Sequence, residues 1–223
     1  MLAYTIAAAI ESKVFDAVIV STDSEETAAI ARHYGAEVPF LRPAEFAGDV
    51  SPDIEWVEYT LAELQRRGRR WDAFSLLRPT SPFRSAETIR RAWARFIGNE
   101  NADSLRAVEK CAQHPAKMWV LEGERMIPLM KASDPAAPPW HSMPYQALPP
   151  IYVQNASLEI AWTRVVTETR TIAGNVLVPF LTERYEGFDI NDPHDWMIAE
   201  RLLADGEVAL PHVAHEPYGA VRA

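Results

Sequence analysis

The sequence predicts an α/β fold with a doubly wound, mostly parallel sheet. Short β-branched apolar runs alternate with amphipathic helical segments, and polar or proline-containing loops follow the apolar runs. Such alternation places binding loops at the carboxyl ends of the strands. With 223 residues, the chain is expected to form one domain, 1–223, rather than two independent ones.

The first elements alternate between helix and strand signals. Residues 1–10 are apolar and run directly into charged residues, which predicts a helix. The run 15–20 predicts a strand, 21–24 supplies helix-capping residues, and Gly35 supplies the stop of that helix. Residues 36–40 predict the next strand.

A second strand-and-helix alternation follows. Ser51 as N-cap and Pro52 as first helical residue predict a helix that ends at Gly68. Residues 71–77 are extended and apolar, and 78–82 must be a loop because two prolines lie in it.

The next helix is capped by Ser85 and turns Ile89, Trp93 and Phe96 inward. Trp56 and Trp196 also fall on inward helical faces, so we expect core positions for them.

The second half begins with a change of pattern. Residues 118–121 with a turn at 122–123 predict a hairpin, and the proline-rich stretch 128–150 excludes a long helix. Strands are predicted over 152–162 and 176–180. Asp192 and Pro193 then open a last helix, with Trp196, Ala199 and Leu203 on one face.

Composition excludes several classes of partner. Acidic residues outnumber basic ones by 31 to 22, which gives a formal net charge of −9, and no dense Lys/Arg stripe is present, so nucleic acid is not expected. The only cysteine, Cys111, cannot form an internal disulfide, which is typical of a reducing compartment and predicts a cytoplasmic protein. No apolar run is long enough to cross a bilayer, so no membrane partner is expected.

Seven short motifs occur in order along nearly the whole chain. They are AYTI (3–6), STD (21–23), LRPAE (41–45), LRPTSPFR (77–84), HP with KMW (114–119), NA (155–156) and DINDPHD (189–195). In this order and spacing, the chain resembles the acylneuraminate (CMP-N-acetylneuraminic acid) cytidylyltransferase family.

The resemblance implies a Rossmann-like domain of the nucleotide-diphospho-sugar transferase type. In the implied reaction, the anomeric hydroxyl of an acidic, sialic-acid-like (nonulosonic) sugar attacks the α-phosphate of CTP and pyrophosphate leaves. The resemblance also implies Mg²⁺ as cofactor and a homodimer, with the hairpin and proline-rich insertion 117–150 reaching the partner. Phosphoryl chemistry needs positioned charges rather than a nucleophilic triad, and the sequence offers no convincing triad.

By the same resemblance, Asp189 is the first metal-binding acid and the expected catalytic residue. Asn191 takes the second metal position, where an amide oxygen ligates Mg²⁺ without contributing charge. For Asp192 and Asp195 we favour a structural interpretation, as N-cap and N3 residues of the last helix.

Arg42 and Ser81 are the candidate nucleotide-binding residues by resemblance. The alternatives are a solvated loop arginine and a turn-capping serine. Asp53 fits the first turn of a helix and receives no functional role.

Four residues are candidates for binding the acidic sugar. Arg78 has the geometry for a bidentate pair with a sugar carboxylate, or it pairs with Glu159 or another acid as structural support. Arg78 and Glu159 replace the glutamine and tyrosine of the sialic-acid enzymes, which puts sialic acid itself in doubt. Lys117 is expected at a neighbouring subunit's site or as a lysine of a hairpin, and Asn155 as a substrate ligand or a turn residue.

The resemblance further implies a strand and a triphosphate-binding loop ahead of the helix that carries residues 3–6. We expect this strand to be central in the sheet, so that without it neighbouring strands keep unpaired backbone groups. The chain as given is expected to have little or no activity, because the loop would stabilise charge on the transferring phosphate.

Other functions remain open. One is a non-catalytic remnant or binding scaffold with the nucleotidyltransferase fold. Another is a cytidylyltransferase for a different acidic sugar, such as a legionaminic-, pseudaminic- or Kdo-like acid. A dehydrogenase is disfavoured because no GxGxxG follows an early strand.

Overall fold

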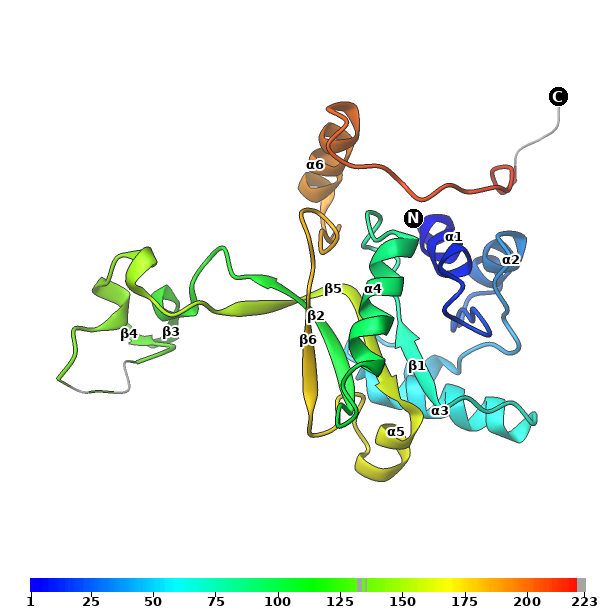
Figure 1. The fold of residues 1–223 in the computed structure, drawn as a ribbon, viewed down its shortest axis with the longest axis horizontal. Helices are drawn as coiled ribbons and strands as arrows, with labels where there is room; N and C mark the ends of the chain where they lie inside the picture. Colours follow the sequence, from blue (N-terminus) through cyan, green and yellow to red (C-terminus); the bar gives the residue numbers. More distant parts are fainter. Residues whose placement is uncertain (132–133, 135, 220–223) are drawn as a thin grey trace. The chain divides into compact units, whose positions relative to one another are not determined.

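The computed structural model describes residues 1–131, 134 and 136–219 and divides the chain into two compact units (Figure 1). Met1–Ala107 and Asn155–Ala223 make up the main unit, and Val108–Gln154 make up the inserted unit. The predicted insertion 117–150 lies within the inserted unit, although residues 132, 133 and 135 of it lie outside the described residues.

The sheet has the strand order β1-β5-β2-β6 among the described residues. Its strands are β1 (Ala73–Leu76), β2 (Ser104–Lys110), β5 (Tyr152–Trp162) and β6 (Leu177–Leu181). β1 and β5 pair in antiparallel register, with Ala73 opposite Trp162, whereas Ile19 and Glu37 form a parallel bridge. The α/β fold is therefore confirmed, but its strands run in mixed directions where a mostly parallel sheet was expected.

The helices of the described residues are α1 (Leu2–Ser12), α2 (Glu25–His33), α3 (Asp53–Arg66), α4 (Ala86–Ile97), α5 (Thr163–Thr169) and α6 (Pro193–Ala204). α4 lies on one face of the sheet, and α3 and α5 lie on the other (Figure 1). α2 begins where expected, since Ser24 accepts a hydrogen bond from the Thr27 N–H. α4 begins with a capping box between Ser85 and Thr88.

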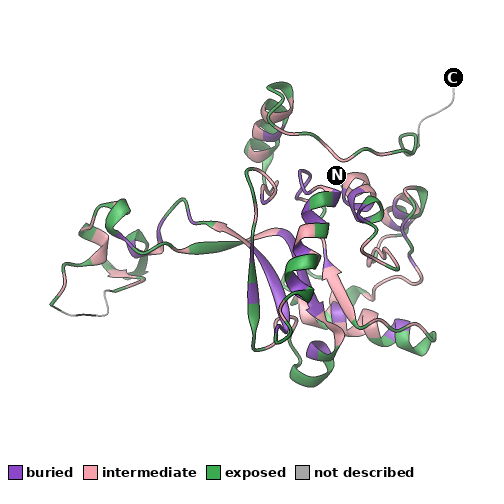
Figure 2. Ribbon diagram, viewed as in Figure 1, coloured by how far each residue is buried: buried purple, intermediate pink, exposed green. Residues whose placement is uncertain are grey.

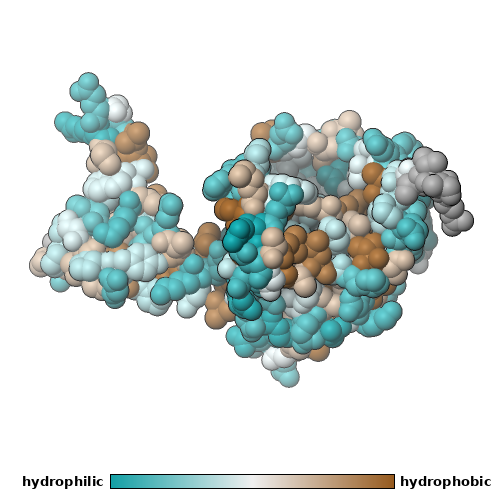
Figure 3. Space-filling view, turned by 90° about the horizontal axis from the view of Figure 1, so that it is seen from above, coloured by the Kyte–Doolittle hydropathy of each residue, from teal (hydrophilic) through white to brown (hydrophobic). Residues whose placement is uncertain are grey.

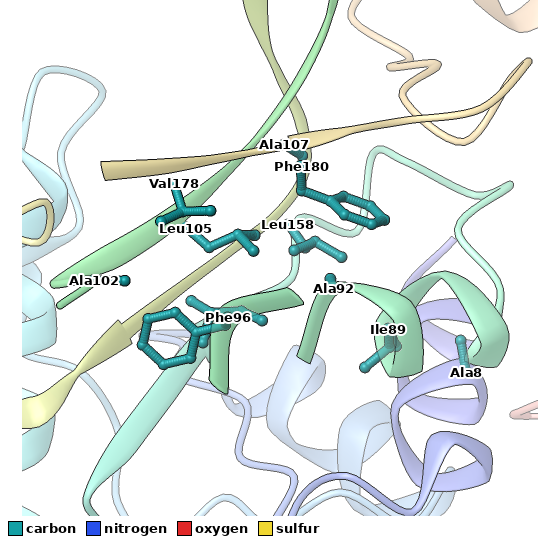
Figure 4. Close-up of a cluster of buried hydrophobic side chains, with 11 residues drawn as sticks. Ala8, Ile89, Ala92, Phe96, Ala102, Leu105, Ala107, Leu158, Val178 and Phe180 are labelled. Atoms are coloured by element: carbon teal, nitrogen blue, oxygen red, sulfur yellow. The ribbon is translucent and has the colours of Figure 1, made fainter. Parts of the chain in front are cut away.

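One face of the sheet carries the largest core cluster (Figures 2 and 4). Ile89 and Phe96 of α4 pack there with Leu105, Leu158 and other buried apolar residues, and Phe96 has no exposed surface. The inward face predicted for α4 is therefore confirmed.

The opposite face is covered by α3 and α5. Val57, Leu76 and Val166 are buried together there, and Trp56 packs against them partly exposed. Since side chains alternate along a strand, Leu158 and Ile160 point to the α4 face and Glu159 points to the α3 face. Glu159 is thus a charged residue on a buried face of the sheet, so it needs a partner of opposite charge.

Three local predictions were wrong. Residues 15–20 and 36–40 form only the single bridge between Ile19 and Glu37, not two strands. Pro52, not Ser51, takes the N-cap position of α3. Trp196 is 47% exposed and is not a core residue, because only Ala199 of α6 is buried.

The inserted unit is built on a hairpin of β3 (Trp119–Glu122) and β4 (Arg125–Pro128). The short 3-10 helices η2 (Pro115–Lys117), η3 (Trp140–Ser142) and η4 (Tyr145–Ala147) accompany it. His114 is buried and bonds the Pro149 carbonyl through Nε2 at 2.9 Å. The expected hairpin is confirmed, and no long helix lies in the described part of the proline-rich stretch.

The Asp103 carboxylate of the main unit accepts hydrogen bonds from Arg164 and from the backbone of Asn175 and Val176. The backbone N–H groups of Asn175 and Val176, followed by Arg164, hold the pKa of Asp103 below its ordinary value. A lowered folded-state pKa gives stability that is complete above the unfolded pKa of about 3.9 and is lost as pH falls through the folded value.

We therefore expect Asp103→Asn to lower the urea midpoint at neutral pH and to make its decline below about pH 4 shallower. Asp205→Asn is the matched control, because Asp205 pairs with an exposed arginine on the surface of α6. If the urea midpoint declines equally steeply below about pH 4 in the Asp103→Asn protein and in the unmodified chain, this role of Asp103 is contradicted.

Candidate functional site

Polar side chains converge where the extended segment 17–20 and strand β1 end. Both are followed by loops, 21–24 and 77–82, which carry the STD and PTSP motifs. A cavity of about 760 Å³ opens here, and Ser21, Arg42 and Arg78 are among its lining residues. This edge of an open α/β sheet is where ligands bind.

Arg42 is held by the loop that follows Ile19. Its guanidinium donates to the Ser21 carbonyl at 2.6 Å and to the Ser21 hydroxyl at 3.2 Å. It also lies over the Trp56 ring, 4.7 Å from the ring centroid. Burial lowers the pKa of Arg42, and the nearby charges of Asp23 and Asp53 partly oppose this shift. The arginine is thus fixed in place rather than free in solvent.

Arg78 sits between two carboxylates. It donates to Asp53 through both terminal nitrogens, and its Nη2 lies 3.7 Å from Oε1 of Glu159. Burial acts to raise the Asp53 pKa, but hydrogen bonds from Arg78 and Trp56 outweigh it and lower that pKa. Arg78 therefore pairs with acidic residues of the chain, as expected if its role is structural support. Its side chain nevertheless remains 37% exposed.

Glu159 links Arg78 to a second arginine. Arg106 of β2 forms an ion pair with Glu159, and both residues are buried. Arg106 also donates to the Ile172 carbonyl at 3.0 Å. Desolvation lowers the Arg106 pKa, with Asp53 opposing the shift. Asp53, Arg78, Glu159 and Arg106 thus form one continuous chain of charges on the α3 face.

Arg84 is a buried cation beneath the PTSP loop. Burial lowers its pKa to about 9. It donates to the Arg78 carbonyl at 3.1 Å, to the Thr5 hydroxyl at 3.0 Å and to the Ser157 carbonyl. No ion pair forms at Arg84 within the part of the chain that the structure describes. The partners of its hydrogen bonds are therefore carbonyl and hydroxyl oxygens.

Asp189 and Ser81 lie close to the same loop. The Ile190 N–H donates to the Thr80 carbonyl at 2.9 Å, which brings the segment of Asp189 against the PTSP motif. Asp189 Oδ1 and Ser81 Oγ are both buried, and neither has a hydrogen-bond partner among the described residues. Such atoms are suited to a metal ion or a ligand.

The expected Mg²⁺ site at Asp189 and Asn191 stays a prediction. Mg²⁺ in nucleotide enzymes needs one or two carboxylates together with substrate phosphates, and Asp189 fits that requirement. Asn191 is exposed, and its backbone N–H donates to Asp195. Among the described residues, no group of three or more His, Cys, Asp or Glu is placed to hold a metal by itself. Asp192 and Asp195 form the expected capping box of α6.

The remaining predicted residues have structural partners. Asn155 donates to the Thr182 hydroxyl at 2.9 Å and accepts from the Ser157 N–H. Lys117, in the inserted unit, donates to the carbonyls of His141 and Met143.

Sequence reasoning missed Asp53, Trp56, Arg84 and Arg106 as site residues. The spacing of Asp53 and Trp56 at the start of a helix was a usable signal, since it places the Trp56 Nε1–H 2.9 Å from Asp53. Arg106 had no such signal, because its partner Glu159 is distant in sequence.

Comparisons with known proteins identify the family of the chain. Residues 1–113 match the family model described as Cytidylyltransferase. A CMP-N,N'-diacetyllegionaminic acid synthase of Legionella pneumophila is 32% identical over 94% of this chain and 88% of its own length. An N-acylneuraminate cytidylyltransferase of Escherichia coli is 45% identical, but over only 40% of this chain and 20% of its own length.

The fold also has solved neighbours. A CMP:2-keto-3-deoxy-manno-octonic acid synthetase, solved with CTP, superposes with a TM-score of 0.61 at 8% identity, covering 92% of this chain and 88% of that one. A 4-diphosphocytidyl-2C-methyl-D-erythritol synthase from Anaerococcus prevotii gives a TM-score of 0.59 at 10% identity, covering 91% and 88%. At such identities the likeness concerns the fold alone. No helix among the described residues has the length and apolarity to cross a membrane.

Proposed function

This chain belongs to the cytidylyltransferase family, and we propose from that premise that it transfers CMP from CTP to an acidic, sialic-acid-like sugar. The observation that carries the proposal is the set of fixed arginines at the strand ends. Arg42 and Arg78 line the cavity and are held there by Trp56 and by Asp53 with Glu159, so two oriented guanidinium groups are available to an anionic nucleotide and an acidic sugar.

In the proposed reaction, the anomeric hydroxyl oxygen of the sugar bonds to the α-phosphorus of CTP. The bridging bond between the α-phosphorus and the departing pyrophosphate breaks, and the hydroxyl proton is lost. The residues position the two anions and stabilise charge on the phosphate oxygens. Arg84 contributes by holding the PTSP loop from beneath through the Arg78 carbonyl.

We assign the nucleotide to Arg42 and Ser81, and the sugar to the neighbourhood of Arg78, Glu159 and Asn155. Arg42 is supported by its fixed position over Trp56, and Ser81 by its unpartnered buried hydroxyl. Asp53 already pairs with the Arg78 guanidinium, so the carboxylate of the sugar would contact only the remaining, exposed part of that group.

Mg²⁺ is the proposed cofactor, and Asp189 would hold it, with Asn191 as a neutral second ligand. When bound, the ion supplies charge neutralisation at the CTP phosphates. The support from this chain is the buried Asp189 Oδ1, which lacks a hydrogen-bond partner among the described residues.

We also propose a homodimer formed through the inserted unit. Its support is the exposed apolar side chains of the hairpin, among them Val120, Leu121 and Met126. Sedimentation of the purified protein would measure the association, and cell fractionation would test the cytoplasmic location that we propose.

Product formation from CTP and a panel of eight- and nine-carbon acidic sugars with Mg²⁺ tests the proposed function. The protein is assayed as the full-length product of its gene. We expect it to form a CMP-sugar with a legionaminic-, pseudaminic- or sialic-type acid. If the protein is folded and reacts with no sugar of the panel, the scaffold alternative replaces the proposal.

A further inference from the structure

Helix α3 turns one polar face toward both loops of the site. Asp53, Trp56 and Thr60 are three and four residues apart, which places them on the same side of the helix. The Trp56 Nε1–H donates to Asp53 at 2.9 Å, and the Thr60 hydroxyl lies 3.3 Å from the Ser21 hydroxyl. Asp53 also accepts hydrogen bonds from Arg78. One helix face thus holds the loop of Ser21 and the loop of Arg78.

Arg78 meets the cavity, and Asp53 supports it. The Arg78 side chain lines the cavity of about 760 Å³, whereas Asp53 is not among the lining residues. The Asp53 side chain is 28% exposed, compared with 37% for that of Arg78. Asp53 therefore acts on a ligand in the cavity through the arginine and not by direct contact.

Apolar side chains accompany this pair on the side of the cavity. Phe74, Leu76 and Trp56 line the same cavity, and Figure 3 shows hydrophobic side chains gathered in the main unit. Charges interact more strongly in such surroundings than in water. Burial acts to raise the pKa of Asp53, but hydrogen bonds from Arg78 and Trp56 hold it below its ordinary value. Asp53 is therefore a carboxylate at neutral pH.

The pairing fixes the direction of the whole guanidinium group. Arg78 Nη1 donates to Asp53 Oδ1 at 3.3 Å, and Nη2 donates to Oδ2. A guanidinium is planar and carries five N–H donors, so a carboxylate held against two of its nitrogens sets the direction of the remaining donors. These donors keep one orientation before a ligand arrives, and binding then loses less rotamer freedom.

We propose that Asp53 is a positioning residue, which fixes Arg78 in the orientation that binds the carboxylate of the acidic sugar. This role rests on the proposed function, because the sugar is the ligand that we assign to Arg78. Asp53 also connects the sugar side to the nucleotide side, since Trp56 contacts both Asp53 and Arg42. Binding of the sugar thus depends on a helix residue outside the lining of the cavity.

Positioning and simple charge effects have opposite signs at Asp53. Its negative charge acts on both Arg42 and Arg78. If charge alone mattered, removing it would strengthen the binding of anions to these arginines. If Asp53 orients Arg78, removing the charge weakens the binding of the sugar. Asp53→Asn keeps the size of the side chain and therefore distinguishes the two effects.

Steady-state kinetics of the full-length gene product test the proposal, with the acidic sugar of the panel that reacts best. We expect Asp53→Asn to raise the KM for the sugar about tenfold, while the KM for CTP stays equal or falls. Glu55→Gln is the matched control, because Glu55 lies in the same helical turn but is exposed. It should change either KM by less than about twofold. A sugar KM that is unchanged or lower in Asp53→Asn overturns the proposal, as does an equal rise in both KM values.

A binding measurement without turnover separates the role of Asp53 from the transfer reaction. The full-length protein, labelled with ¹⁵N-arginine, is mixed with a non-hydrolysable CTP analogue and with each sugar of the panel in turn. The Arg78 guanidinium signal is assigned by its loss in Arg78→Lys. We expect this signal to shift with the sugar, and Asp53→Asn to need about ten times more sugar for the same shift.

The two measurements distinguish the possible failures. If CMP-sugar forms but the Arg78 signal shifts with no sugar of the panel, the role of Asp53 is refuted and the proposed function stands. If the signal shifts and no product forms, only the transfer reaction is refuted. An equal sugar dependence of the shift in the unmodified protein and in Asp53→Asn overturns the proposal as well.

Discussion

Glu159→Gln is expected to lower the free energy of unfolding by about 3 to 5 kcal/mol. Glu159 and Arg106 are both buried, and each side chain is 10% exposed. Removing the carboxylate charge leaves the Arg106 guanidinium buried without its partner, whereas the amide keeps the size of the side chain. The loss comes from that uncompensated charge rather than from a cavity. Urea denaturation of the purified variant measures it.

Two controls separate this explanation from a general effect of charge removal. Glu63→Gln removes an acid of α3 whose partners, Arg66 and Arg67, have side chains 66% and 50% exposed, so its effect should stay below about 1 kcal/mol. The double change Glu159→Leu with Arg106→Met removes both charges and should recover most of the loss. A Glu159→Gln loss no larger than that of Glu63→Gln would refute the buried-pair explanation.

Asp189→Asn is expected to lower kcat/KM for CMP-sugar formation by the full-length gene product by about 100- to 1,000-fold. The substitution keeps the shape of the side chain but removes the negative charge that we propose binds Mg²⁺. The Mg²⁺ concentration for half-maximal rate should rise as well. Steady-state kinetics over a range of Mg²⁺ concentrations measure both quantities.

Asp195→Asn is the control for this prediction. Asp195 accepts hydrogen bonds from the backbone of Asn191 and Asp192 and belongs to the capping box of α6. Its loss should lower the Tm and leave the Mg²⁺ dependence unchanged. If Asp189→Asn acts like Asp195→Asn, the carboxylate of Asp189 has a structural role only.

Elements with local signals were predictable from the sequence. Ser85 at the start of α4 and Asp192 at the start of α6 satisfy backbone donors a few residues away, so their caps can be recognised in the sequence. The run 152–162 matches β5, since strand-favouring residues such as Tyr152, Val153 and Ile160 are also a local signal.

Inference from helical spacing was wrong for Trp196, which is exposed. Helical spacing predicts which residues share a face of a helix, but not whether another element covers that face.

Strand pairing and charge pairing depended on contacts distant in sequence. Residues 15–20 have strand composition, yet Ile19 has a backbone partner on one side only, so no ladder forms among the described residues. The pairing of Arg78 with Asp53 joins residues 25 positions apart, and that of Arg106 with Glu159 is longer still. The resemblance to the family made Arg42 and Asp189 candidates, whereas the chain of charges on the α3 face could be recognised only from the fold.

Transfer of label from CTP tests the central claim most directly. The full-length gene product is incubated with Mg²⁺, the preferred acidic sugar and CTP carrying ³²P at either the α- or the γ-phosphate. The account predicts that the α-label appears in the CMP-sugar and the γ-label in pyrophosphate, in equal amounts. Release of the α-label as free CMP without sugar product, or binding of CTP without any cleavage by a folded protein, would contradict it.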